Sequence, residues 1–229
     1  QVTFTLAAVT TGAPMPAEED RVQILTAPGT VSFGTIALTK ADKDQTYEYT
    51  ITETATNFPN GWSHTGPVTA TVVVSDNGAG ELTADVTYSP ANKTITNSYS
   101  TKGDITFSGK KELKNRKLQD KEFTFELYIT GEDFELTDGQ EPIQTKQNAE
   151  DGTYSFEKID YDGSDLNKNA DGYYVETKKY YKIIEKIPTG DEKDPSVTYT
   201  NKEYNITATL TDNGKGKIEV VADPSETTY

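Results

Sequence analysis

The sequence predicts an all-β protein built from two tandem immunoglobulin-like β-sandwich domains. Three observations lead to this fold class: Thr, Val and Tyr recur along short alternating segments, no long stretch has helical periodicity, and the whole pattern occurs twice. A hydrophobic fraction of 33% in 229 residues also suits thin, two-layer domains with much exposed surface.

The repeat pairs four segments of the first half with four of the second half, in the same order. The pairs are VTFTL (2–6) with FTFEL (123–127), VSFGTI (31–36) with YSFEKI (154–159), YEYTITE (47–53) with KYYKIIE (179–185), and TATVVVSDNGAGEL (69–82) with NITATLTDNGKGKI (205–218). We therefore expect one domain over residues 1–100 and a second over residues 101–229. The Asn-Gly steps of DNGAG and DNGKG predict hairpin turns, because Asn and Gly tolerate positive φ.

Composition excludes several classes of function. A net charge of −15 argues against binding nucleic acid or an anionic membrane surface. The chain has no cysteine, so disulfides and thiolate chemistry are absent. His64 is the single histidine, which rules out a histidine-based triad or zinc site, and we expect no cofactor. The sequence begins in what reads as mid-strand, which we interpret as a piece of a longer precursor.

A carboxylate interrupts the apolar face of the same strand in both repeats. Side chains alternate between the two faces of a strand, so Glu53 shares a face with Tyr49 and Ile51. In the second repeat, Glu185 shares a face with Ile183. The same coincidence in two aligned strands indicates that these positions carry chemistry.

Two further strands place a polar residue on an apolar face. In ITFSGKKEL (105–113), Lys111 alternates with Phe107 and Gly109, and in TITNSY (94–99), Asn97 alternates with apolar neighbours. We expect Glu53, Glu185, Lys111 and Asn97 all to point inward. The plainer alternatives are carboxylates at a wet sheet rim, a lysine that extends along its apolar stem to solvent, and an asparagine that only bonds backbone.

These residue types can form a covalent bond. Burying an isolated charge is costly, and desolvation lowers the pKa of a lysine and raises that of a glutamate. A neutral lysine amine is a nucleophile, a protonated carboxyl group can polarise an amide oxygen, and the asparagine amide carbon is an electrophile. Together they would form a Lys–Asn isopeptide bond and release ammonia, with one turnover in each domain.

The chain resembles the isopeptide-linked pilin domains of Gram-positive bacteria, the family of the streptococcal T-antigen-like major pilins and collagen-adhesin B-type surface stalks. The segments that carry the resemblance are GKKELKNRKLQDKEFTFEL (109–127), the two YxYxIxE-type strands, the DNGxG hairpins and ITNSY (95–99). By this resemblance Lys111 is a bond lysine, Asn97 a bond asparagine, and Glu53 and Glu185 are the catalytic acids.

The sequence departs from the family pattern at both ends. The first domain lacks the lysine strand that should precede it, and the second lacks the final asparagine strand. Lys111 and Asn97 thus belong to different domains, and the thirteen residues between them leave no room for the parallel connection that a mutual bond would need.

The resemblance implies a structural rather than an enzymatic role. We expect an extracellular, cell wall-anchored subunit of a pilus shaft or adhesin stalk, joined by sortase to other pilin subunits or to the cell wall, without membrane contact from this fragment. The alternative is an adhesin module that recognises a host protein or glycan, for which Trp62, Phe58 and Tyr47 could form a stacking patch.

The insertion at 160–178 imitates a calcium loop. Asp165, Asn167, Asn169 and Glu176 occupy ligand positions, but Ala170 stands where the turn requires glycine. The sequence therefore favours a solvated surface loop without a metal.

Overall fold

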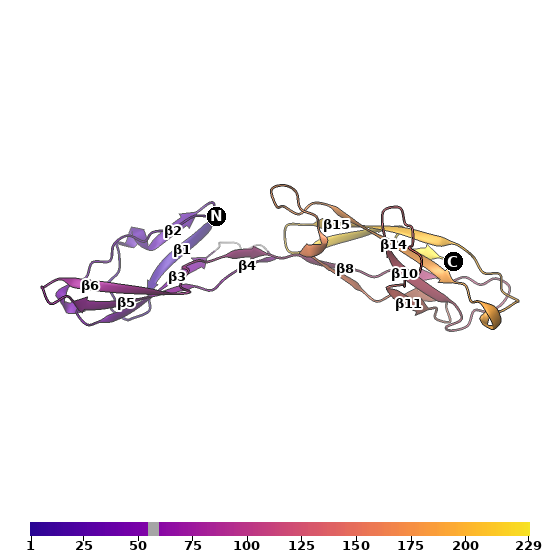
Figure 1. The fold of residues 1–229 in the computed structure, drawn as a ribbon, viewed down its shortest axis with the longest axis horizontal. Coiled ribbons are helices and arrows are strands. Elements are labelled where there is room, and N and C mark those ends of the chain that lie inside the picture. The colour runs from indigo at the N-terminus through magenta and orange to yellow at the C-terminus, as the bar shows by residue number, and fades with distance from the viewer. Residues whose placement is uncertain (55–59) are drawn as a thin grey trace. The chain divides into compact units, whose positions relative to one another are not determined.

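The computed structural model describes residues 1–54 and 60–229 and divides the chain into two units, Gln1–Tyr99 and Ser100–Tyr229 (Figure 1). We call them domain one and domain two. Apart from four short 3-10 turns, the regular structure of the described residues consists of β-strands, which confirms the predicted all-β class. The turns are η1 (Glu18–Arg21), η2 (Lys40–Asp42), η3 (Gly163–Asp165) and η4 (Gly190–Glu192). No described helix is long and apolar enough to cross a membrane.

Domain one contains a five-stranded antiparallel sheet in the order β2-β1-β3-β5-β6, and a separate ribbon of β4 and β7. Its strands are β1 (Val2–Ala8), β2 (Val22–Leu25), β3 (Thr46–Thr54), β4 (Trp62–His64), β5 (Val68–Asp76), β6 (Leu82–Ser89) and β7 (Asn97–Tyr99).

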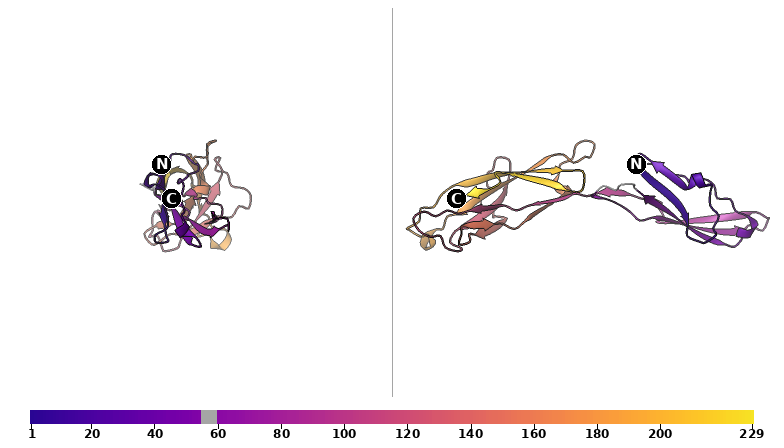
Figure 2. Two further views of the ribbon diagram at one scale, coloured as in Figure 1. Left: turned by 90° about the vertical axis from the view of Figure 1, so that its left-hand side faces the viewer. Right: turned by 180° about the vertical axis from the view of Figure 1, so that it is seen from behind.

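Domain two repeats this sheet in the order β11-β10-β14-β15-β16 and faces it with the shorter sheets β12-β9-β17 and β13-β8 (Figures 1 and 2). Its strands are β8 (Lys102–Ile105), β9 (Ser108–Lys110), β10 (Thr124–Thr130), β11 (Gln144–Gln147), β12 (Thr153–Ser155), β13 (Ile159–Asp162), β14 (Thr177–Lys186), β15 (Glu203–Asp212), β16 (Ile218–Asp223) and β17 (Thr227–Thr228). The equal strand orders show that the sequence repeat is a structural repeat.

Both predicted hairpins form. The side-chain oxygen of Asn77 accepts a hydrogen bond from the amide of Ala79 at 2.8 Å, and Asn213 accepts one from Lys215 at 2.8 Å. The following glycines, Gly78 and Gly214, have φ of +79° and +70°. These turns fix the register of β5 with β6 and of β15 with β16.

The last strand of domain two, β17, lies beside β9 and parallel to it. β17 pairs with β9 through Thr227 opposite Gly109, and Tyr229 continues the ladder by donating its amide to Lys110 O at 2.9 Å. A Cβ on Gly109 would collide with the hydroxyls of Thr227 and Tyr154, so glycine permits this close approach. The closing strand of domain two is therefore present in part, whereas the sequence analysis expects it to be absent.

The insertion at 160–178 also differs from expectation, because it contributes to the core. Tyr161 and Leu166 are buried in domain two, and the Tyr161 hydroxyl lies 2.6 Å from that of Tyr181. Residues 167–173 and 175–176 are exposed. Periodicity missed this because the two inward residues are separated by a 3-10 turn rather than by strand alternation.

The two domains differ in how far their inner faces are covered. Domain two has a large core in which Phe125, Leu127 and Ile183 are fully buried. In domain one the segment 31–36, the counterpart of β12, forms no strand, and a groove of about 740 Å³ lies open over the inner face. The residues that line this groove include Leu6, Phe33, Ile36, Val86, Tyr88 and Ile95.

We expect domain one to unfold before domain two, because its core buries less apolar surface. Trp62, the single tryptophan, reports on domain one, so the urea midpoint from its fluorescence should lie below that from the ellipticity of the remaining structure. Leu210→Ala, in the core of domain two, should lower only the second midpoint. Coincident midpoints in the native chain would contradict this expectation.

Candidate functional site

Domain two brings an inward lysine and an inward glutamate into direct contact. Lys111 follows the last residue of β9, and its Nζ donates to Glu185 Oε2 at 2.7 Å. The lysine side chain is 6% exposed and that of the glutamate 0%. Both side chains therefore point into the core, as alternation predicted, and the alternative in which Lys111 extends along its apolar stem to solvent does not hold.

Aromatic rings surround this pair. Phe125 lies opposite Glu185 in the register of β10 with β14 and stacks on Tyr154 with 3.9 Å between ring centroids. Tyr229 packs against Phe125 and donates its hydroxyl to Ile183 O at 2.6 Å. Burial raises the pKa of both tyrosine hydroxyls, so they remain protonated and add no charge to the site.

Burial also raises the pKa of the Glu185 carboxyl group, and the hydrogen bond and charge of Lys111 offset this only in part. Glu185 Oε1 is buried and has no hydrogen-bond partner among the described residues. Burial thus disfavours the charged form of the Glu185 carboxyl group. The protonated form is the one that could polarise an amide oxygen.

Domain one places the homologous glutamate against an amide instead. Glu53 is 6% exposed and lies opposite Phe4 in the register of β1 with β3, as Glu185 lies opposite Phe125. Its Oε1 accepts a hydrogen bond from Asn97 Nδ2 at 2.8 Å, while its buried Oε2 lacks a partner within the described part of the chain. A half-turn of the Asn97 amide would bring Oδ1 to the same place, next to the Glu53 carboxyl group.

Asn97 differs from the other three residues, because it is exposed. The prediction that it points into a covered core is wrong, although its side chain does reach Glu53. Alternation gave the correct face of the strand. Alternation could not show how the strand is covered. Among the described strands β7 pairs only with the short β4, and Asn97 stays exposed.

The remaining sequence candidates do not gather into a site. Asp165 pairs with Lys179 at 3.3 Å, and the side chain of Asn169 accepts from the amides of its own turn. Tyr47 is buried in domain one, Trp62 is 44% exposed and packs at 5.2 Å against Tyr99, and Phe58 lies outside the described residues.

Alternation also places Phe123 on the inner face with Phe125, but it did not indicate that Phe123 contacts Lys111. The lysine Nζ lies 4.3 Å from the Phe123 ring centroid. The buried Asn148, which holds the backbone of Phe123, gave no pattern-level signal at all.

A family described as the Spy0128-like isopeptide containing domain matches residues 1–100 and again residues 107–229. The chain belongs to this family. The two matches coincide closely with the two domains, so each domain is one copy of the Spy0128-like unit. The family is one of structural proteins rather than enzymes.

Solved structures that resemble this family member include three major pilins of Streptococcus pyogenes. One has 14% identity and a TM-score of 0.31, and the alignment covers 100% of this chain and 91% of that one. The T3.2 pilin has 14% identity and a TM-score of 0.30, with 99% and 89% covered, and the T-13 pilin has 16% and 0.29, with 99% and 88% covered. The comparison with curated proteins gave no match. The family assignment depends on the two family matches alone.

Removing either partner of the buried pair should destabilise domain two strongly. Glu185→Leu or Lys111→Met leaves an unpaired charge or an unpaired polar group in the core, at a cost of about 3–5 kcal/mol. The double variant Lys111→Met/Glu185→Leu should recover most of this loss. Lys117→Ala, which removes an exposed ion pair with Glu150, should cost at most about 1 kcal/mol. Urea unfolding measures all four, and a double variant as unstable as the sum of the singles would refute a compensated buried pair.

The stability contributed by Glu185 should fall as pH rises. A folded-state pKa above the ordinary value of 4.5 means that folding takes up a proton. This contribution is therefore fully present below pH 4.5 and is lost as the pH rises through the raised pKa. As pH rises through that window, the unfolding free energy of the native chain should fall relative to that of Glu185→Gln. A difference that instead grows in favour of the native chain with rising pH would reverse the assigned direction.

Proposed function

We propose that the chain is a two-domain part of a pilus shaft subunit or surface stalk whose domains are locked by Lys–Asn isopeptide bonds. One observation carries the proposal: homologous glutamates at the same strand position are 6% and 5% exposed, and one holds an amide while the other holds an amine. Family membership and the pilin names of the similar structures support the same function.

The reaction within each domain needs only groups of the protein. A proton passes from the lysine ammonium to the glutamate, the amine attacks the asparagine Cγ, and the Cγ–Nδ2 bond breaks. The departing Nδ2 receives the two protons that the lysine nitrogen gives up and leaves as ammonium. The buried glutamate carries a proton between the two nitrogens and ends unchanged. Aromatic neighbours exclude water, which would otherwise compete as nucleophile and solvate the charges.

Domain one supplies the acid and the amide, so a lysine must reach Glu53 from a strand laid in the open groove. Domain two shows the geometry of such a strand, because β9 lies antiparallel to β12 and parallel to β17. In domain one the segments 29–36 and 92–95 line the groove at the corresponding places. We propose a lysine-bearing strand there and, for domain two, an asparagine on a continued β17. The domain limits 1–100 and 101–229 belong to this proposal.

The cellular setting follows from this function. We propose an extracellular location at the cell wall, with other pilin subunits as partners and sortase as the enzyme that joins them. The alternative, a module that binds a host protein or glycan, would draw on the exposed Trp62 ring, which packs on Tyr99. Loss of host binding in Trp62→Ala, with folding retained, would favour it.

Intact-mass measurement tests the chemistry. The 229-residue chain should have the mass expected from its sequence, because the described residues of neither domain bring a lysine, a glutamate and an asparagine together. A longer chain that includes the natural flanking segments should lose the mass of one ammonia per domain.

Variants of the longer chain separate the two sites. Glu53→Ala should abolish the loss from domain one and Glu185→Ala that from domain two. Glu126→Ala, which removes another buried glutamate of the same sheet, should leave both bonds intact. Ammonia loss from the 229-residue chain, or loss that survives in both glutamate variants, would show that the residues are assigned wrongly.

A further inference from the structure

Lys111 has a second contact besides Glu185. Its Nζ lies over the ring of Phe123, 4.3 Å from the centroid, and the ring is 2% exposed. The negative face of an aromatic ring attracts an ammonium group, most strongly where water is excluded. The lysine is thus held between a carboxylate and an aromatic face.

Phe123 is itself fixed by one buried side chain. Asn148 is 1% exposed, and its Oδ1 accepts from the amide of Phe123 at 2.7 Å. Its Nδ2 donates to Gln119 O at 2.8 Å and to Ala149 O at 2.9 Å, while its backbone amide donates to Phe123 O at 3.2 Å. Both backbone polar groups of Phe123 therefore bond to this single residue.

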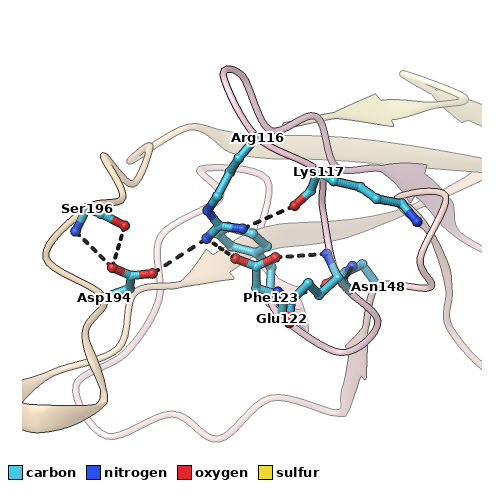
Figure 3. A network of polar contacts seen from close by, with 8 residues as sticks. Arg116, Lys117, Glu122, Phe123, Asn148, Asp194 and Ser196 are labelled. Carbon is cyan, nitrogen blue, oxygen red and sulfur yellow. Dashed lines mark hydrogen bonds and ion pairs between the residues drawn. The ribbon is translucent and has the colours of Figure 1, made fainter.

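Ion pairs at the surface also hold the segment that precedes Phe123. Figure 3 shows Arg116 reaching both Glu122 and, at 3.5 Å, Asp194, which belongs to the loop after β14. The Glu122 carboxylate also accepts from the amide of Gln119 at 2.9 Å. The Phe123 ring completes the connection by packing against Tyr199 with 5.8 Å between centroids. Two loops thus close over the end of domain two where Lys111 lies.

We propose that Phe123, fixed by Asn148, is a positioning residue that holds the Lys111 amine at Glu185 before the asparagine strand docks. A lysine stem is long enough to carry its charge out to solvent, and the ring and the carboxylate together oppose this. This inference rests on the proposed isopeptide function, since it explains why the nucleophile waits inside the core.

Domain one provides an internal comparison. The repeat aligns Phe123 with Val2, and Val2 cannot offer an aromatic face. Phe123→Val therefore installs the residue that the homologous position carries. Phe123→Tyr keeps the ring, and Phe156→Val removes a ring of similar burial that packs on Tyr154 elsewhere in the same core.

Two NMR signals of the 229-residue chain test the role directly. The first is the Lys111 ammonium cross-peak, which is visible only while burial slows exchange with water. The second is the titration of the Glu185 carboxyl carbon, whose pKa the lysine lowers. Phe123→Val should abolish the cross-peak and raise the Glu185 pKa further, Asn148→Ala should move both signals in the same direction, and Phe123→Tyr should keep both.

Phe156→Val should lower stability without moving either signal. If Phe123→Val does not fold, Phe123→Leu, which retains more of the buried volume, takes its place. Unchanged signals in the folded variant, or equal shifts in Phe156→Val, would overturn the proposal. The NMR signals come from the 229-residue chain and the mass measurements from the longer one, so the two tests stand apart: absence of ammonia loss in the longer chain would refute the function, and unchanged signals would refute the positioning role.

Discussion

Desolvation of a carboxyl group is the constraint on which the rest of this structure depends. A glutamate in a β-sandwich core is tolerated only if something compensates its charge, and each domain meets this need differently. In domain two the compensation is a lysine that directly follows β9, and the rings of Phe125, Tyr154 and Tyr229 fit around the pair. In domain one it is an amide from the last strand. Compensation of the glutamate charge, as well as apolar packing, therefore determines which strands lie next to each other.

The repeated sheet orders show how much of this follows from sequence alone. Two-residue periodicity gave the faces of β3, β14 and β9 correctly, because one face of each strand must be apolar, and so it located Glu53, Glu185 and Lys111. For Asn97 it gave the correct face but not the burial, which depends on what lies across the domain rather than on its own strand. It also missed the buried part of the insertion, and it missed β17, because a strand of two residues shows no period.

The contacts of Phe123 and Asn148 lay beyond pattern reasoning for a different reason. Both act through geometry between segments that are 25 residues apart, and neither residue type is unusual where it stands. Residues outside any periodic pattern therefore form part of the lining of the site. The same applies to Arg116, whose role depends on the approach of a loop almost eighty residues further along the chain. Sequence identifies the reactive groups here more readily than the groups that support them.

The parallel alignment of β9 and β17 determines how a pulling force acts on the hydrogen bonds between them. When domain two is pulled from its two ends, β9 is drawn toward one end and the parallel β17 toward the other. The backbone hydrogen bonds between them are then sheared together rather than broken one at a time. Tyr229 extends this ladder through both its amide and its carbonyl group. Lys111 lies at the end of the same ladder, so a covalent bond placed there would reinforce the pair of strands that bears the shear first.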